Sequence, residues 1–278
     1  MRWFTLLLVG CVSVQAAGAV INVPGLHGPT IQAAIDVAVN GDEIIVAPGT
    51  YPESIDFLGK AITVRSSDPT DIGVVLNTII DGTGFFHVVL CVAGEGPETL
   101  LSGFVITGGN ANGGAFDIGG GMLIDNSSPT VTNCSFIGNT ADNGGGMFNR
   151  SSSPTVTNCS FSGNTADTNG GGMYNFLSGP TVTNCSFSGN SAGSSGGGMY
   201  NLPNKFDINP TVTNSGFCNN TPNQIGGFGT WIDGGGNSLL YCPPPIPVPP
   251  SCPADINTDT NVNVTDLLAL LAAWGACP

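Results

Sequence analysis

A motif of about 25 residues, repeated four times between residues 119 and 220, limits most strongly what this chain can fold into. Each copy starts with Gly-Gly-Gly-Met and continues to Thr-Val-Thr-Asn. The methionines are Met122, Met147, Met173 and Met199, so the copies are 25, 26 and 26 residues apart. A fixed period of this size indicates a stack of similar units, each of which completes its core only against its neighbours.

The repeated unit is made of strands and turns. Each copy contains three short β-forming runs separated by Gly, Asn, Ser and Pro, and none is long enough for an amphipathic helix. Strand alternation in the second copy turns Val156, Cys159 and Phe161 inward and the intervening Thr and Ser residues outward. Asn158 falls where the chain must turn, and asparagine tolerates the left-handed backbone that a tight corner requires.

Stacking such units at the roughly 4.8 Å spacing of parallel strands places equivalent residues above one another in ladders. The expected ladders are Val131/Val156/Val182/Val212, Phe136/Phe161/Phe187/Phe217 and Asn133/Asn158/Asn184/Asn214. The amide side chains of an asparagine ladder can hydrogen-bond to one another along the stack. We therefore predict an all-β fold, a parallel β-helix of about eight coils. Extra residues before Pro210 in the fourth copy predict a longer loop at one corner.

Residues 1–19 have the features of a secretory signal, with Arg2 followed by a short apolar run and small residues. We therefore expect a secreted or cell-surface protein with no transmembrane helix in the mature chain. The Leu-Val-Gly-Cys sequence at residues 8–11 also resembles a bacterial lipobox. Lipid anchoring through Cys11 is therefore an alternative.

A short amphipathic helix is predicted ahead of the first coil. Thr30 can cap this helix, and Gly41-Asp42 ends it. Its apolar face consists of Ile31, Ala34, Ile35 and Ala38. Because the terminal coil of a solenoid exposes its apolar core, we expect this helix to cover the core.

Two stretches of the chain resemble known families. The segment TIQAAIDVAVNGDEIIVAPGTYPESI, at residues 30–55, is similar to the opening of pectin-lyase-like right-handed β-helix proteins. The repeats GGGM…FIGN and GGGM…FSGN resemble those of polymorphic outer-membrane proteins. This resemblance implies a right-handed parallel β-helix over residues 20–241, with an N-terminal capping helix. It also implies a fold that hosts lyases and hydrolases, although fold alone does not decide function.

A proline-rich linker, residues 242–253, is followed by a small module over residues 254–278. Its oxygen-bearing residues have the spacing of a twelve-residue calcium loop, followed by a helix-forming run. The predicted Ca²⁺ ligands are Asp255, Asn257, Asp259, the carbonyl of Asn261, and Asp266.

The module resembles a dockerin repeat, with two differences. Thr260 replaces the preferred glycine, and a single repeat is present, which argues against a cohesin partner. The alternative to calcium binding is a solvated loop that caps the final helix.

The charge balance excludes some partners. The chain has 5 Lys+Arg against 19 Asp+Glu, a formal net charge of −14, so nucleic acid and anionic membranes are poor partners. We expect a polysaccharide or a cell-surface glycan instead.

The nine cysteines are interpreted by position. Cys134, Cys159 and Cys185 share one slot of the repeat, which predicts an inward ladder of free thiols. A Cys252–Cys277 disulfide would close a loop of about 25 residues and stabilise the tail. Cys218 and Cys242 are a second candidate pair, whereas Cys91 has no obvious partner.

A glycoside hydrolase needs two carboxylates across the bond, about 5 to 9.5 Å apart. The candidates are Asp81, Asp117, Asp125, Asp142 and Asp167, of which the last two belong to a repeated NTAD turn. The few Lys and Arg residues lie in no recognisable lyase motif. We therefore assign no catalytic residue and predict a protein for adhesion or polysaccharide contact. The alternatives are a polysaccharide lyase or glycoside hydrolase, and a purely structural envelope protein.

Calcium binding is tested by calorimetry on the isolated, oxidised peptide 252–278. The loop spacing predicts heat of Ca²⁺ binding at or below millimolar concentrations. If no heat were measured, the dockerin-like interpretation would reduce to a structural tail.

Overall fold

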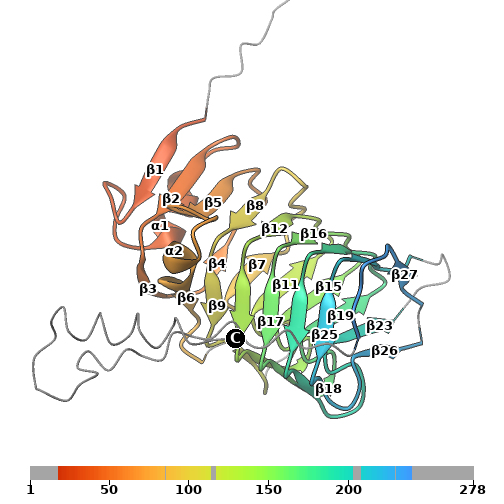
Figure 1. Cartoon of the computed structure of the whole chain (residues 1–278). Helices are drawn as coiled ribbons and strands as arrows, with labels where there is room; N and C mark the ends of the chain where they lie inside the picture. The colour runs from red at the N-terminus through yellow and green to blue at the C-terminus, as the bar shows by residue number, and fades with distance from the viewer. Residues whose placement is uncertain (1–17, 85, 114–116, 203–207, 229, 240–278) are drawn as a thin grey trace, which may run out of the picture. The chain divides into compact units, whose positions relative to one another are not determined.

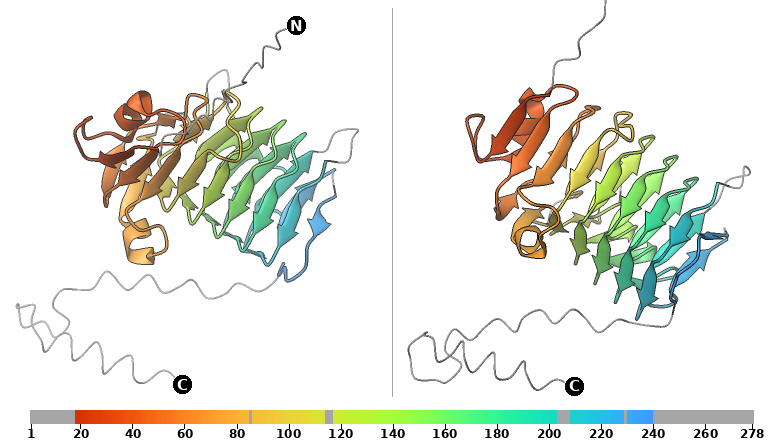
Figure 2. Two further views of the ribbon diagram at one scale, coloured as in Figure 1. Left: turned by 90° about the horizontal axis from the view of Figure 1, so that it is seen from above. Right: turned by 45° about the horizontal axis from the view of Figure 1, so that its top comes forward.

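The computed structural model describes residues 18–239, except residues 85, 114–116, 203–207 and 229. Residues 1–17 of the predicted secretory signal, the proline-rich linker, the five predicted calcium ligands and most of the longer corner loop lie outside the described residues. The described chain winds into a parallel solenoid of about eight turns, the right-handed β-helix predicted above (Figures 1 and 2). No helix in this described part is long and apolar enough to cross a membrane.

Each regular coil contributes one strand to each of four sheets, named A to D in the order in which they follow one another around a repeated coil. Sheet A contains β1 (Val20–Val23), β2 (Glu43–Val46), β5 (Thr63–Ser66), β8 (Leu100–Ser102), β12 (Thr130–Thr132), β16 (Thr155–Thr157), β20 (Thr181–Thr183), β24 (Thr211–Thr213) and β27 (Ile232–Asp233). Sheet B contains β3 (Gly49–Pro52), β6 (Thr78–Asp81), β9 (Val105–Thr107), β13 (Ser135–Ile137), β17 (Ser160–Ser162), β21 (Ser186–Ser188) and β25 (Gly216–Cys218).

The other two sheets complete each coil. Sheet C contains β10 (Asn110–Ala111), β14 (Thr140–Asn143), β18 (Thr165–Asn169) and β22 (Ser191–Ala192). Sheet D contains β4 (Ile55–Asp56), β7 (Val89–Cys91), β11 (Met122–Asp125), β15 (Met147–Arg150), β19 (Met173–Phe176), β23 (Met199–Leu202) and β26 (Ile225–Gly227).

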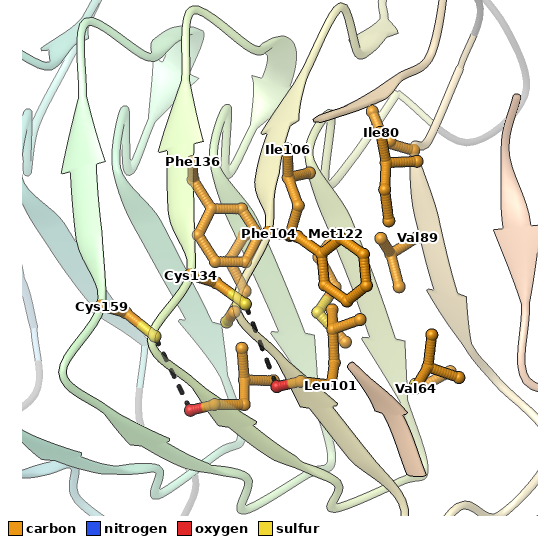
Figure 3. Packing of buried hydrophobic residues seen from close by; sticks show 14 of the residues in the cluster. Val64, Ile80, Val89, Leu101, Phe104, Ile106, Met122, Cys134, Phe136 and Cys159 are labelled. Atoms are coloured by element: carbon orange, nitrogen blue, oxygen red, sulfur yellow. Dashed lines mark hydrogen bonds between the residues drawn. The ribbon is translucent and has the colours of Figure 1, made fainter. Parts of the chain in front are cut away.

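The predicted inward ladders are confirmed. Val156 pairs in register with Val131 and Val182, and all three side chains are fully buried. The rings of Phe136, Phe161, Phe187 and Phe217 stack with centroids 4.7, 4.6 and 4.5 Å apart. Figure 3 shows that Ile106 and Ile80 continue the row of Phe136 into the irregular coils. The core is therefore one continuous column of stacked side chains.

The predicted thiol ladder is also present. Cys134, Cys159 and Cys185 are free and buried, and each thiol donates to the threonine carbonyl two residues earlier. Burial raises the pKa of the Cys159 thiol well above its ordinary value, which fits a packing role. Cys91 is buried and free, whereas Cys218 is disulfide-bonded. The partner of Cys218 lies outside the described residues, as does the expected partner Cys242.

The predicted asparagine ladder forms the corner between sheets A and B. Asn133, Asn158, Asn184 and Asn214 have φ of 54°, 54°, 53° and 48°, the left-handed conformation expected for them. The amide of Asn158 donates to Asn133 and that of Asn184 donates to Asn158, both at 3.2 Å.

A second asparagine ladder, which we did not predict, lies at the corner between sheets B and C. Its members are Asn139, Asn164, Asn190 and Asn220, all buried. In the second copy, Asn164 Oδ1 accepts from the backbone N–H of Asn139, and Asn164 Nδ2 donates to the carbonyl of Phe136. These side chains satisfy corner backbone groups that the sheets leave unpaired.

The repeated NTAD segment was wrongly predicted as a turn, because its Thr-Ala-Asp residues form the strands of sheet C. Ala141 and Ala166 pair in register and point inward. Thr168 is the additional residue that makes the second copy one residue longer, and it produces a bulge between Ala141 and Asn143. The Thr168 hydroxyl donates to Asp142 at 2.7 Å.

The capping helix is confirmed as α1 (Ile31–Val37), at the N-terminal end of the solenoid (Figure 1). Thr30 Oγ1 accepts from the backbone N–H of Ala33 at 3.3 Å, as predicted. The helix ends at Val37, before the predicted Gly41. Both oxygens of Glu53, from the next coil, accept N–H groups of the first turn at 2.8 and 2.9 Å. A second helix, α2 (Ile72–Leu76), was not predicted.

The repeated glycine triplet is explained by the close approach of successive coils between sheets C and D. Gly144 has a φ of +68°, which favours glycine. A Cβ on Gly145 would lie 2.3 Å from the carbonyl oxygen of Thr165, and one on Gly146 would lie 2.5 Å from that of Gly172. Any larger residue would therefore force adjacent coils apart.

The buried asparagine ladder predicts a large difference between two asparagines of one coil. In Asn164→Leu, the N–H of Asn139 and the carbonyl of Phe136 lose their partners, at about 1–3 kcal/mol each. We expect a clearly lower urea unfolding midpoint. The matched control is Asn158→Gly, at the exposed corner, where glycine keeps the left-handed backbone and the midpoint should change little. Equal effects of the two substitutions would contradict the conclusion that the buried asparagine ladder satisfies backbone groups at this corner.

Candidate functional site

Asp125, a sequence-predicted catalytic candidate, is held in an ion pair on the outer face of sheet D. Arg150 occupies the same slot one coil later. Its Nε donates to Asp125 Oδ1 at 2.9 Å and its Nη2 donates to Oδ2. Hydrogen bonding to Asp125 raises the pKa of Arg150. With both oxygens bonded to one guanidinium, this carboxylate is arranged as a structural partner of Arg150.

The face around this ion pair is apolar. Leu123, Phe148, Tyr174 and Tyr200 form an outward ladder that is nevertheless buried, with Ile118 packed against it. The ring centroids of Phe148 and Tyr174 are 4.8 Å apart, and burial raises the pKa of Tyr174 to about 12. These rings face one another, so their faces are not open for stacking on a ligand.

The remaining candidate acids lie on other parts of the solenoid. Asp81 ends β6 in sheet B, and its Oδ1 accepts from the backbone N–H of Thr83 at 2.8 Å. Asp142 and Asp167 lie in sheet C, and Asp142 accepts from Thr168 and Asn143. The backbone carbonyl of Asp117 accepts from Asp142 N–H at 2.9 Å. Since Asp81 and Asp125 lie on different sheets, they do not form the pair that glycoside hydrolysis requires.

Two surface hollows of the described chain contain at most one acid each. One, of about 540 Å³, lies beside α2, and its single acid, Asp71, accepts from Gly73 N–H at the helix start. The other, of about 460 Å³, lies at the last coil beside Trp231 and is lined by no acid. Neither hollow brings two carboxylates together. Within the described residues, no group of three His, Cys, Asp or Glu side chains is arranged to hold a metal ion.

His87 is the more buried of the two histidines, both of which lie outside the repeats. Its Nδ1 lies 2.9 Å from the carbonyl oxygen of Gly119, so this nitrogen carries the proton in the neutral ring. Burial lowers the pKa of His87 below its ordinary value, an effect that the hydrogen bond to Gly119 partly opposes. The Ser54 hydroxyl donates to the backbone carbonyl of His87 at 2.7 Å. These contacts join successive coils and indicate a structural role.

The outer faces of sheets A and B, and the corner between them, form a different kind of surface over the four repeated coils. Their outward residues on sheet A and at the corner are hydroxyl and amide side chains, with no ionisable group on sheet A, whereas sheet B also exposes Ile137. The rows on sheet A are Thr130/Thr155/Thr181/Thr211 and Thr132/Thr157/Thr183/Thr213, next to the corner row Asn133/Asn158/Asn184/Asn214. On sheet B, the serines of β13, β17 and β21 continue the polar surface. We call this surface the polar face.

The threonines of the polar face differ in their hydrogen bonding. Thr130 donates to the carbonyl of Pro97 at 2.9 Å, and Thr132 donates to the Ser102 hydroxyl at 2.9 Å. In the next three coils, the threonine hydroxyls of β16, β20 and β24 make no hydrogen bond to any described residue. These hydroxyls are therefore available to a ligand.

Comparisons with known proteins give only weak structural matches. No protein-family model matches the sequence, and no curated protein matches it. Similar solved structures include a pectin methylesterase from carrot (13% identity, TM-score 0.46) and pectin methylesterase PemA from Erwinia chrysanthemi (11% identity, TM-score 0.44). The matches cover 77% of this chain, with 65% of the carrot protein and 80% of the Erwinia protein. Such weak likeness transfers no activity to this chain.

The sequence alone did not reveal the ion pair between Asp125 and Arg150, or which threonine hydroxyls are available to a ligand. Asp125 and Arg150 are 25 residues apart, one period of the repeat, so the ladder rule could have paired them. The open threonines were correctly predicted to point outward. Their availability depends on Pro97 and Ser102, which lie in an irregular coil.

The partly buried His87 predicts a pH dependence of stability. Above the ordinary pKa of about 6.5, both folded and unfolded states hold His87 neutral. As the pH falls below this value, the unfolded state takes up the proton first, so the free energy of unfolding falls and then levels below the folded-state pKa. We expect His87→Gln to reduce the loss of unfolding midpoint between pH 7 and pH 5.

The matched control is His27→Gln, at the other histidine, measured over the same pH range. An unchanged pH dependence in His87→Gln would show that other groups account for the acid sensitivity.

Proposed function

We propose that this protein is a secreted or cell-surface, non-catalytic solenoid that binds polysaccharide through its polar face. The observation that carries this proposal is the run of open hydroxyl and amide groups along sheets A and B, repeated in register from coil to coil. Hydroxyls and amides are the groups with which proteins hydrogen-bond to sugar hydroxyls. A periodic surface of this kind is suited to a periodic polymer.

The arrangement of acids supports a non-catalytic role. Asp125 is bonded to Arg150, Asp81 lies in sheet B, and Asp142, in sheet C, accepts hydrogen bonds from Thr168 and Asn143. Binding by repeated, individually weak contacts requires no convergence of catalytic groups. Each additional equivalent contact raises the overall affinity.

The segments outside the described residues extend the proposal. The secretory signal at residues 1–19 would deliver the solenoid to the cell surface or beyond it. The module at residues 254–278 would bind Ca²⁺ through Asp255, Asn257, Asp259, Asn261 and Asp266. Both assignments rest on sequence patterns.

A screen of the purified mature protein against acidic and neutral polysaccharides, with added calcium, tests the proposal. We expect retention on at least one polymer without new reducing ends, unsaturated ends or methanol from methyl-esterified pectin. Release of any of these products would show that the protein is an enzyme. Absence of both retention and release would favour a purely structural role.

A pair of variants locates the binding surface. Thr181→Lys places a long charged side chain on the polar face, whereas Ser194→Lys places one on an exposed turn between sheets C and D. We expect Thr181→Lys to weaken retention by at least tenfold and Ser194→Lys to leave it unchanged. Loss with Ser194→Lys alone would move the binding surface away from sheets A and B.

A further inference from the structure

Six threonines of the polar face form a regular array, which we call the threonine platform. It consists of Thr155, Thr157, Thr181, Thr183, Thr211 and Thr213, on β16, β20 and β24. Strand geometry spaces equivalent threonines roughly 4.8 Å apart along the solenoid axis and separates the two rows by roughly 6.6 Å. The array therefore has two parallel rows of hydroxyls, with one hydroxyl of each row per coil.

The ends of the platform are set by neighbouring coils. On the N-terminal side, the hydroxyls of Thr130 and Thr132 are bonded to Pro97 and Ser102. On the C-terminal side, Ile232 of β27 pairs with Thr211, and Gly234, which lies beside the Thr213 hydroxyl, brings no side chain to the second row. The stretch of open hydroxyls is therefore three coils long.

The platform carries no charge, although the protein as a whole has a formal net charge of −14. Arg65, the cation of sheet A, lies several coils away and is paired with Glu43 at 2.6 Å. A polyuronate would therefore meet no cation on the platform and would be repelled by the acidic protein around it. A neutral polymer has neither disadvantage.

The spacing of the platform selects one geometry among neutral polymers. An extended β-1,4-linked chain advances by close to one strand spacing per sugar and carries hydroxyls along both of its edges. Lying along the solenoid axis, such a chain would present an edge to each threonine row, and the threonine methyl groups would contact its apolar ring faces. Helical α-linked chains do not keep this register.

We infer that the threonine platform binds a neutral, extended β-1,4-linked glycan along the solenoid axis, with one sugar per coil and three sugars in contact. This inference deepens the proposed function and rests on it. It assigns the substrate class, the direction of the chain and the length of the binding site.

Chain length provides the first test. β-1,4-linked glucose oligomers of two to six units are titrated into the mature protein and followed by calorimetry. One hydrogen bond of typical strength corresponds to about a fivefold change in affinity, so the step from two to three units should be at least this large. Further units should add little. An affinity that rises steadily to six units would overturn the three-coil site.

Matched substitutions provide the second test. Thr157→Val with Thr183→Val removes two platform hydroxyls while keeping the shape and the strand preference of the side chains. We expect about tenfold to thirtyfold weaker binding of the three-unit oligomer. The control is Thr140→Val with Thr165→Val, the same changes at two paired threonines of sheet C, outside the polar face, and its binding should stay within about twofold of wild type.

The outcomes separate the inference from the proposed function. If polysaccharides retain the protein but the platform variant binds like wild type, this inference is wrong and the proposed function stands. If no polysaccharide retains the protein, the proposed function fails and the inference fails with it. Unfolding midpoints of both double variants, compared with wild type, show whether weaker binding reflects the lost hydroxyls or a damaged fold.

Discussion

Nearly every side chain in the repeated coils must tolerate a similar side chain one strand spacing away along the solenoid axis. Like charges do not tolerate this arrangement, whereas stacked phenyl rings, amides that bond to the next amide, and hydroxyls do. This constraint explains why only 9% of the residues are charged. It also bears on two of the places where charge enters the repeats. Asp125 meets Arg150, and the bulge at Thr168 gives Asp142 a hydroxyl partner where a second carboxylate would otherwise follow.

The same constraint decided which parts of the fold could be predicted. The valine, phenylalanine, thiol and corner asparagine ladders were visible because repetition marks a position and alternation gives its direction. The strand at Thr140–Asn143 was missed, because its Asp and Asn residues look like turn formers and its pairing comes from equivalent strands in other coils. Helix α2 occurs once and has only five residues, so no period marks it. The role of the glycine triplet required the distances between coils.

The candidate binding surface also has a part that could be predicted from the sequence and a part that could not. Alternation alone places the platform threonines on the outside of sheet A. The difference between a bonded hydroxyl at Thr130 and an open one at Thr155 arises from Pro97, which belongs to a coil outside the repeat. The separation of Asp81 from Asp125 likewise depends on which sheet each strand joins. Long-range packing, which has no periodic signal in the sequence, therefore determines where ligands can bind.

Stacking also governs how such a surface can be specific. One threonine hydroxyl exchanges a bond to water for a bond to a ligand and gains little. A rigid array in register loses no additional conformational freedom as successive contacts form, because the core column of valines and phenylalanines already fixes the coils. Specificity then comes from matching a repeat distance rather than from any single contact. A polymer whose repeat distance differs from the coil spacing can make the first contact as well as a matching polymer does. Its second and third sugars then lie out of register with the next threonines. The solenoid core and the ligand preference are in this sense two consequences of the same strand spacing.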